Sequence, residues 1–389
     1  MKRFAALTAL LITPLIAFTQ PKIDVKKQFS IAQQHYTRML QTHTDLTRFP
    51  QSTNPDGSPR DMKSDWWCSG FFGGSLWYIY EYTNDPKWKD AAHTWTMAVE
   101  KEKYNTRTHD LGFMLYCPFG NGYRLTKNPQ YKEVMLTGAK SLATRFNPKV
   151  GLIKSWEKLG KYQYPVIVDN MMNLEFLFWA ARESGDKTFY NLSVTHADNT
   201  LKNHFRPDNS SYHVVCYGPN GEVEAKVTHQ GYSDESAWAR GQAWALYGYT
   251  DMYRETKDKK YLAQAEKIAD FILNHPNLPA DKIPYWDFNA PNIPNEERDA
   301  SAGAITASAL LELSTYTGKK GKVYFDAAEQ MLQSLSGDAY LAKPGENNNF
   351  ILKHSVGAKP LKSEIDTPLV YADYYYLEAL LRYQKLAKR

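Results

Sequence analysis

The sequence predicts an all-α fold, and three observations carry this prediction. A helical hairpin pattern recurs along the chain, a coarse count gives about twelve helices, and no strong strand pattern occurs outside the loops. In each copy an aromatic-rich helix ends, a polar turn follows, and an aromatic residue opens an Ala-rich helix. Six such hairpins predict a closed α/α barrel or toroid, with an open helical solenoid as the alternative.

The polar turns are the clearest element of the repeat, because Asn, Asp, Gly and Pro end one helix and start the next. After each turn the apolar spacing is helical. Tyr261, Ala265 and Ile268, for example, stand at i, i+4 and i+7. The five turns with their flanking aromatics span residues 78–88, 123–131, 181–190, 253–261 and 313–324.

The helices can be placed in order from this pattern, with uncertain ends. Because one architecture repeats throughout, we predict a single domain over residues 21–389. The predicted helices lie near residues 26–45, 70–83, 86–101, 110–126, 129–146, 170–184, 187–204, 234–256, 259–275, 300–317, 321–336 and 368–388.

The N-terminal segment has the pattern of a secretory signal peptide. Basic residues Lys2 and Arg3 precede an apolar run from Phe4 to Phe18, which is shorter than the ~20 residues of a membrane span. No Cys lies near the end of the run, so a lipoprotein anchor is not expected. We predict a signal peptide over residues 1–20 and a periplasmic or secreted mature protein.

Composition narrows the class of protein. A hydrophobic fraction of 43% supports a globular core and excludes intrinsic disorder. Removing the signal peptide lowers the formal net charge from +5 to about +3, which suits a small anionic ligand and not a nucleic-acid surface. Cys68, Cys117 and Cys216 are odd in number and widely spaced, so we expect free or partly paired thiols and no zinc site.

The connections between successive hairpins are longer than the turns and richer in Trp, His, Asp and Gly. In an antiparallel ring they meet at one mouth, where the helices that follow them begin. Helix N-termini favour an anionic ligand there. One connection, Val214 to Lys226, has the pattern of a small hairpin. The connecting segments richest in these residues are 66–73, 108–113, 168–173, 229–244 and 286–301.

Two carboxylates stand out in these connections. Asp110 stands at a predicted helix start, and Asp169 opens the run Asp-Asn-Met-Met-Asn. Either could simply cap a helix. Both lie among apolar residues, where burial beside a second carboxylate raises a pKa and keeps one group protonated near neutral pH. The pair could therefore divide acid and base work.

Arg240 lies in an otherwise aromatic and small-residue helix and requires a partner. One interpretation is an internal salt bridge with Asp234 or Glu235. The other is a bidentate clamp on a ligand carboxylate. Neutral hydrogen-bonding groups occur in the same zone, and each also has an ordinary structural interpretation; they are His213, His229 and Gln230.

Tryptophans in the mouth segments are candidate platforms for sugar stacking, with core packing as the alternative for each. They are Trp67, Trp156, Trp244 and Trp286. The chain contains no phosphate-binding loop, no dinucleotide fingerprint and no nucleophilic Ser elbow.

Together these motifs resemble the unsaturated glucuronyl hydrolases, glycoside hydrolase family 88. The resemblance rests on His109-Asp-Leu-Gly-Phe-Met, Asp169-Asn-Met-Met-Asn-Leu and the long run from His229 to Trp244. Segments 284–288, 298–301 and 368–380 are also similar, so the likeness covers residues 25–388. It implies an (α/α)6 barrel, in agreement with the helix count.

The resemblance also implies an unusual reaction. Polysaccharide lyases leave a C4=C5 double bond in the uronic acid at the non-reducing end of their products. The family hydrates this enol ether: a proton adds at C4, water adds at C5, and the hemiketal rearranges and expels the remaining sugar chain. No metal or organic cofactor is implied.

Residue roles carry over by motif. Asp169 would protonate C4 and then accept a proton from the incoming water. Asp110 would hold ring hydroxyls and help to keep Asp169 protonated. Binding of the uronate and its neighbouring sugar would involve His213, Gln230, Arg240, Trp244, Trp67, Trp156 and His229, and a late loop with Ser355 and Lys359 would border the next sugar.

Other functions remain compatible with these residues. One is an inverting glycosidase that acts on saturated uronate-containing oligosaccharides through two carboxylates. Another is a non-catalytic sugar-binding protein, or an epimerase, on a similar barrel. As partners we expect the oligosaccharide substrate but no nucleic acid and, after signal removal, no membrane. We expect a monomer or a weak homo-oligomer.

Overall fold

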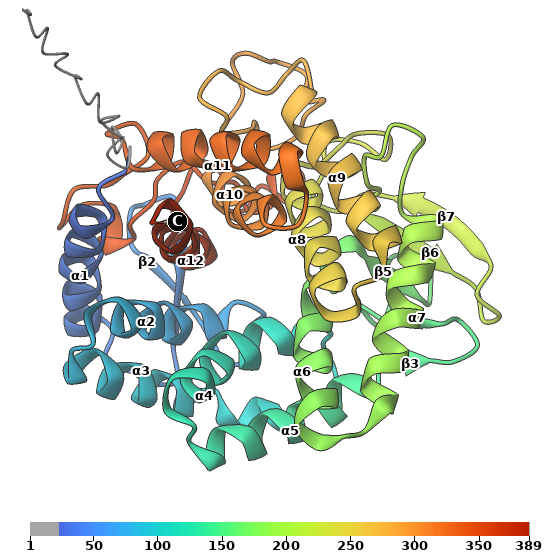
Figure 1. Ribbon diagram of the computed structural model, residues 1–389, viewed down its shortest axis with the longest axis horizontal. Coiled ribbons are helices and arrows are strands. Elements are labelled where there is room, and N and C mark those ends of the chain that lie inside the picture. The colour runs from blue at the N-terminus through green and yellow to red at the C-terminus, as the bar shows by residue number, and fades with distance from the viewer. Residues whose placement is uncertain (1–22, 389) are drawn as a thin grey trace, which may run out of the picture.

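The computed structural model describes residues 23–388, so the predicted signal peptide lies outside the described residues. Within this range the α-helices follow one another around a ring (Figure 1). They are α1 (Val25–Thr42), α2 (Ser69–Thr83), α3 (Pro86–Ala98), α4 (Asn121–Thr126), α5 (Pro129–Ala143), α6 (Leu174–Ser184), α7 (Lys187–Asn203), α8 (Ala239–Thr256), α9 (Lys259–Asn274), α10 (Ala300–Ser314), α11 (Gly321–Leu335) and α12 (Val370–Ala387).

Even-numbered helices form an inner ring, and odd-numbered helices cover it. Every residue of α8 from Ala239 to Met252 is buried, whereas α9 buries one stripe that includes Tyr261, Ala265 and Ile268. Helix α12 packs against both α10 and α2, which closes the ring. The predicted (α/α)6 barrel is therefore confirmed, and the open solenoid is excluded.

Four of the five short turns share one construction, which explains their sequences; the α10–α11 turn instead runs through the 3-10 helix η4 (Gly318–Lys320). The inner helix ends at a residue with left-handed backbone geometry, and the next side chain accepts the N–H two residues further on, capping the outer helix. Two residues thus reverse the chain. The pairs are Asn84–Asp85, Lys127–Asn128, Gly185–Asp186 and Lys257–Asp258.

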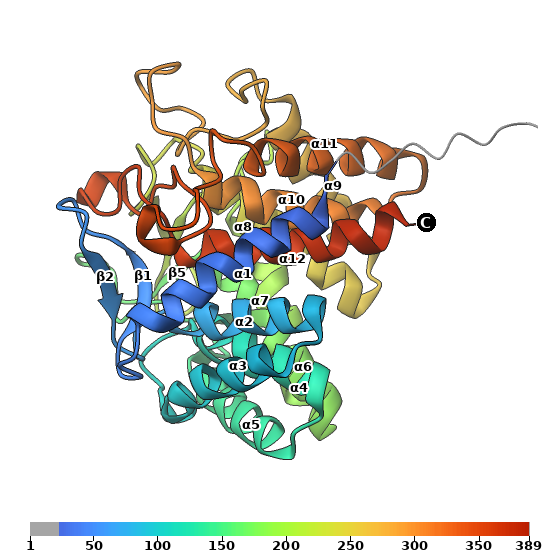
Figure 2. The same ribbon diagram turned by 90° about the vertical axis from the view of Figure 1, so that its left-hand side faces the viewer.

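Every strand of residues 23–388 lies in a long connection, and Figure 2 shows β1, β2 and β5 at the opposite end of the barrel from these turns. The predicted hairpin at 214–226 is confirmed, because β6 pairs antiparallel with β7. A third strand, β5, pairs with β6 and leads directly to Asp169. The strands are β1 (Phe49–Thr53), β2 (Pro59–Met62), β3 (Phe146–Asn147), β4 (Leu152–Ile153), β5 (Pro165–Ile167), β6 (Val214–Tyr217) and β7 (Val223–Val227).

Three predicted helix boundaries differ from the structure. The helix expected over 110–126 is a π-helix, η2 (Gly112–Gly120), continued by α4; Pro118 inside it has no N–H to donate. The chain before α6 forms the 3-10 helix η3 (Val168–Asn173). A start at residue 234 is wrong, because residues 234–238 form a turn held by Asp287 and α8 begins at Ala239.

Candidate active site

A pocket of about 250 Å³ opens at the mouth of the barrel. The long connections supply its walls, as the ring predicts. Seven of the predicted site residues line it: Trp67, Asp110, Trp156, Asp169, His229, Gln230 and Arg240.

Asp169 lies in the first turn of η3, directly after β5. Burial raises the pKa of its carboxyl group to about 7; the Arg240 charge opposes the rise, and the Asp110 charge adds to it. Neither this carboxyl nor that of Asp110 caps a helix in the structure, so the capping alternative fails for both. Asp169 is therefore a carboxylic acid that is half protonated near neutral pH.

Asp110 is held by Thr108 and lies beside His109. Thr108 Oγ1 donates a hydrogen bond to its Oδ2 over 3.0 Å, and Nε2 of His109 lies 3.2 Å from its Oδ1. His109 is itself fixed by a 3.0 Å hydrogen bond from Nδ1 to the carbonyl oxygen of Ser155. His109 lines the pocket although the sequence interpretation did not include it; its position beside Asp110 was the available signal.

The segments that carry the two aspartates are joined at Gly112. Its N–H donates a 2.8 Å hydrogen bond to Oδ1 of Asn173, at the end of η3. A Cβ at residue 112 would lie 2.5 Å from the same oxygen, so only glycine allows this approach. The contact sets how η2 and η3 present Asp110 and Asp169.

His213 lies behind the pocket wall, with Nε2 3.8 Å from Oδ2 of Asp169. Its Nδ1 accepts the backbone N–H groups of His229 and Gln230 at 3.1 and 3.2 Å. Burial holds the pKa of His213 well below its usual range, so the ring is neutral and its proton is on Nε2. A neutral N–H donor thus faces the Asp169 carboxyl, and neither atom has a hydrogen-bond partner among the described residues.

Arg240 is fully buried, and its ion-pair partner is Asp299 at 3.0 Å, not Asp234 or Glu235. Its guanidinium also donates to the carbonyl oxygens of Val356 and Gly357. Because five N–H groups are available and three are used here, donors remain for a ligand carboxylate. Arg240 therefore both anchors the late loop and lines the pocket.

The tryptophans divide into two kinds. Trp67 and Trp156 are half-buried and line the pocket; the Trp156 ring lies 5.0 Å from that of His229. Trp244 is buried behind Asp169, and its side chain acts to lower the pKa of that carboxyl against the effect of burial. The Trp244 ring centroid lies 5.2 Å from that of Phe113. Trp286 is buried and donates to Glu296, so it is a packing residue.

The two predicted residues of the late loop lie outside the lining. Ser355 is fully buried, and its Oγ accepts the N–H of Ser301 at 3.1 Å. Lys359 is half-buried and forms ion pairs with Glu296 and Glu297, so its charge is neutralised. The same loop lines the pocket with Gly357, Ala358, Leu361, Ser363 and Glu364 instead.

Three further polar residues in the lining were missed in the sequence. Burial raises the pKa of Glu364, whose Oε1 accepts a hydrogen bond from Gln51. Arg60 donates to Ser363 Oγ at 3.1 Å. The Tyr371 hydroxyl is buried without a hydrogen-bond partner among the described residues. Only Tyr371 carried a signal, since it lies in the first turn of an inner helix.

No group of three or more His, Cys, Asp or Glu side chains within residues 23–388 is placed to hold a metal ion. In the same range no helix is long and apolar enough to cross a bilayer. All three cysteines are buried free thiols. The charged groups of the pocket are the carboxyls of Asp169, Asp110 and Glu364 and the guanidiniums of Arg240 and Arg60.

Comparisons with known proteins agree with this site and fold. The family model described as Glycosyl Hydrolase Family 88 matches residues 42–385. An unsaturated glucuronyl hydrolase of Formosa agariphila is 48% identical, over 93% of this chain and 91% of that protein. An unsaturated chondroitin disaccharide hydrolase of Streptococcus pneumoniae is 32% identical, over 95% of each chain.

A solved structure extends the likeness to three dimensions. The crystal structure of an unsaturated glucuronyl hydrolase specific for heparin superposes with a TM-score of 0.91 at 53% identity, covering 94% of this chain and 98% of that one. Since the family model spans most of the chain and the relatives match nearly its full length, the chain belongs to Glycosyl Hydrolase Family 88.

Proposed function

We propose that this enzyme removes a 4,5-unsaturated uronic acid from the non-reducing end of lyase-generated oligosaccharides by hydrating the C4=C5 double bond. The observation that carries the proposal is the buried Asp169 carboxyl with a pKa of about 7. A group with this pKa is available as an acid and, after donating, as a base at neutral pH.

The substrate is an enol ether, because the ring oxygen is bonded to C5. Asp169 donates its proton to C4, and the positive charge that develops at C5 is shared with the ring oxygen. The Asp169 carboxylate then accepts a proton from water as the water oxygen bonds to C5. The resulting hemiketal opens to a ketone, and the hemiacetal left at C1 expels the rest of the sugar chain as an alcohol.

The surrounding residues have separate roles in this proposal. Asp110, fixed by Thr108, accepts hydrogen bonds from ring hydroxyls, and its charge supports the high pKa of Asp169. The free donors of Arg240 and the Nε2–H of neutral His213 bind the uronate carboxylate. The rings of Trp67 and Trp156 supply apolar faces for the sugars.

The test follows the alkene itself. The conjugated C4=C5 bond absorbs in the ultraviolet, and hydration removes this absorbance. We expect the purified enzyme to abolish the absorbance of unsaturated uronyl disaccharides and to leave saturated uronides intact. Cleavage of a saturated uronide while the unsaturated substrates persist would favour an inverting glycosidase instead.

The source of the substrate is tested with a panel of unsaturated disaccharides that differ in linkage and sulfation. The 53% identity to a structure specific for heparin supports heparin-derived disaccharides as the first members of the panel. The name of the Streptococcus pneumoniae relative supports chondroitin-derived disaccharides as the second.

We further propose that the enzyme is exported to the periplasm or secreted, on the support of Lys2, Arg3 and the apolar run Phe4 to Phe18. Cell fractionation of the full chain tests this proposal, and recovery of uncleaved protein in the cytoplasm would contradict it. We also propose a monomer or weak homo-oligomer, which light scattering during gel filtration tests.

A further inference from the structure

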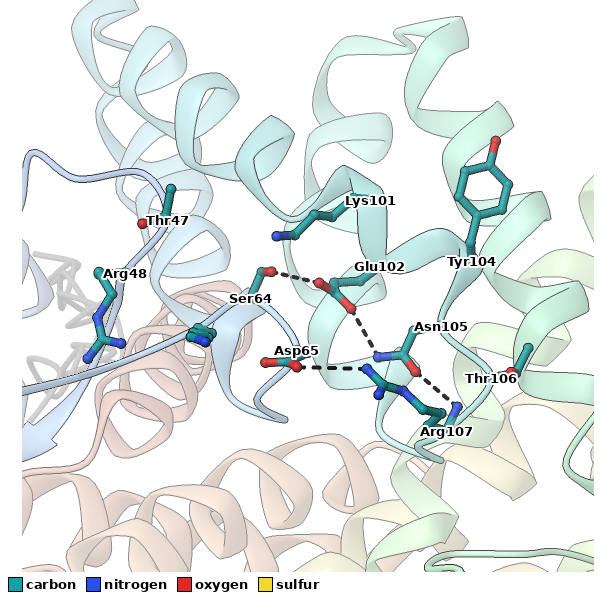
Figure 3. Close-up of a pocket in the computed structure, with 11 residues that line it drawn as sticks. Thr47, Arg48, Ser64, Asp65, Lys101, Glu102, Tyr104, Asn105, Thr106 and Arg107 are labelled. Atoms are coloured by element: carbon teal, nitrogen blue, oxygen red, sulfur yellow. Dashed lines mark hydrogen bonds and ion pairs between the residues drawn. The ribbon is translucent and has the colours of Figure 1, made fainter.

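A second hollow, of about 640 Å³, lies at the outer edge of the mouth (Figure 3). Three chain segments meet around it: the residues before β1, the residues after β2, and the 3-10 helix η1 (Glu100–Tyr104) with the loop that follows. No role in the proposed reaction accounts for it.

Positive charge predominates in this hollow. Its lining includes Arg48, Lys63, Lys101 and Arg107. Lys63 and Lys101 are exposed and have no acidic partner within residues 23–388. Like charges gathered from separate segments repel one another, and a bound anion removes that repulsion.

The two acidic residues of the lining leave this charge largely unopposed. Glu102 is buried, where its carboxylate accepts hydrogen bonds from Ser64 Oγ at 2.6 Å and Asn105 Nδ2 at 3.0 Å (Figure 3). Asp65 is exposed and lies 3.9 Å from Arg107, at the outer limit of an ion pair. Glu102 thus stabilises the loop through these hydrogen bonds, and Asp65 is the acidic side chain of the lining that lies near a cation.

The hollow and the active-site pocket share a wall. Asp65 lines the hollow, whereas the next residue, Trp66, lines the pocket. In the same way Arg107 lines the hollow, and His109, two residues later, lines the pocket. An oligosaccharide that leaves the pocket over this wall reaches the basic side chains directly.

An exposed aromatic ring lies on the same route: Trp66 is 39% exposed at the shared wall. Sugar rings stack on such faces, whereas their acidic groups require cations.

Resting on the proposed function, we propose that this hollow is a distal subsite for the carboxylate or sulfate groups of a longer acidic oligosaccharide. The unsaturated end of the oligosaccharide occupies the pocket, and a sugar farther toward the reducing end places its anionic group between Lys63, Lys101 and Arg107. A disaccharide ends before the hollow and makes no contact there.

The test compares a charge-reversal variant, Lys63→Glu with Lys101→Glu, on an unsaturated disaccharide and on the sulfated unsaturated tetrasaccharide. We expect kcat/KM for the tetrasaccharide to fall about tenfold, mainly through KM, while the disaccharide changes less than about twofold. The difference should shrink at about 0.5 M salt, which screens exposed charges. Lys89→Glu with Lys267→Glu is the matched control, since both lysines are exposed on outer helices.

An unchanged tetrasaccharide rate, or equal losses on the two substrates, would overturn the subsite. A desulfated tetrasaccharide distinguishes the two anionic groups: a smaller loss than for the sulfated one assigns the hollow to the sulfate, and an equal loss assigns it to the carboxylate. Failure of the proposed function is separate, because the unmodified enzyme would then leave the alkene absorbance of every substrate intact.

Discussion

Asp169 at the mouth and Glu312 near the other end are both buried carboxyl groups, yet their pKa values shift in opposite directions. Burial raises the pKa values of Asp251 and Glu175 near Glu312 as well, so the contrast is between two groups and their partners. At the mouth, burial raises the pKa of Asp169 to about 7, and the Arg240 charge does not offset it. Near the other end, burial also opposes ionisation of Glu312, but Arg254 and Arg382 outweigh burial and lower its pKa to about 2. Two arginines therefore keep Glu312 ionised, whereas Asp169 can retain a proton near neutral pH and use it in chemistry.

Hydrogen bonding shows the same contrast. A cavity of about 460 Å³ at the far end is lined by side chains that satisfy one another: Glu378 accepts from Tyr78 at 2.8 Å and from Tyr247 at 3.1 Å. At the mouth, Asp169 Oδ2, His213 Nε2 and the Tyr371 hydroxyl are buried without partners among the described residues. Unsatisfied polar groups carry a cost in stability, and two of these three belong to residues that line the substrate pocket.

The largest expected effect comes from Asp169→Asn, which removes the exchangeable proton. We expect turnover to fall about 10³- to 10⁴-fold while substrate binding survives, measured by loss of alkene absorbance and by calorimetry. Asp326→Asn, an exposed change on α11, is the control. A turnover near that of the unmodified enzyme would remove Asp169 from the acid role.

The matching change at the far end is Glu312→Gln, which leaves Arg254 and Arg382 without this carboxylate. We expect the free energy of unfolding to fall by about 3 kcal/mol with kcat unchanged while the protein is folded. Denaturant titration measures the loss, and Glu133→Gln on the exposed face of α5 is the control. A loss of kcat in the folded variant would contradict the division between the two ends.

The pH dependence of kcat/KM should follow the free enzyme's Asp169. Because the proton donor is lost as pH rises through about 7, we expect kcat/KM to fall roughly tenfold per unit above that pH. A profile that is flat to pH 9 would contradict the assignment.

The same two carboxyls should impose opposite pH dependences on stability. For Asp169 the folded pKa is raised from 3.8, so stability from its neutral form is present below about pH 4 and is lost as pH rises through 7. For Glu312 the folded pKa is lowered from 4.5, so stability is present above that pH and lost as pH falls toward 2. At pH 8, Asp169→Asn should therefore be more stable than the unmodified enzyme by on the order of 4 kcal/mol, and at pH 4 the difference should vanish. Melting curves of both proteins at pH 8 and pH 4 measure this difference. An equal stability of the two proteins at pH 8 would contradict a cost of burying the ionised Asp169.

A smaller effect is expected for Arg240→Lys, which keeps the charge but loses the planar fork. We expect KM to rise about tenfold for the uronate substrate and about threefold for its methyl ester, because only the acid uses the free donors. Steady-state kinetics on the two substrates tests this difference. Equal increases in KM for the two substrates would contradict binding of the uronate carboxylate by Arg240, whose role would then be limited to its contacts with Asp299 and the late loop.

Much of the fold was predictable because its signals are local. Helical spacing and the Asx-capped turns are contained within about twenty residues of chain, so the helix order and the hairpin at 214–226 are confirmed. The family resemblance is confirmed as well, since its motifs are contiguous runs such as His229 to Trp244. The start of α8 was misplaced because its N-cap, Trp238, carries no capping side chain.

The site was predictable in part. Asp110 and Asp169 stood out as carboxylates in apolar runs, and both line the pocket. Glu364 and Arg60 did not, because they lie in the late loop and in β2, about 300 residues apart in the chain, and only the closed ring brings them together. Trp244 and Trp67 looked alike as sequence, yet one is buried behind Asp169 and the other lines the pocket.

The sequence by itself determined the repeated hairpins, the polar turns, the family and the two aspartates, because each is written in neighbouring residues. Only the tertiary structure decided that Arg240 pairs with Asp299, that Lys359 is neutralised by Glu296 and Glu297, and that a basic hollow adjoins the pocket. These contacts join separate loops at the mouth, and their energies depend on distance and burial, which closure of the ring alone establishes.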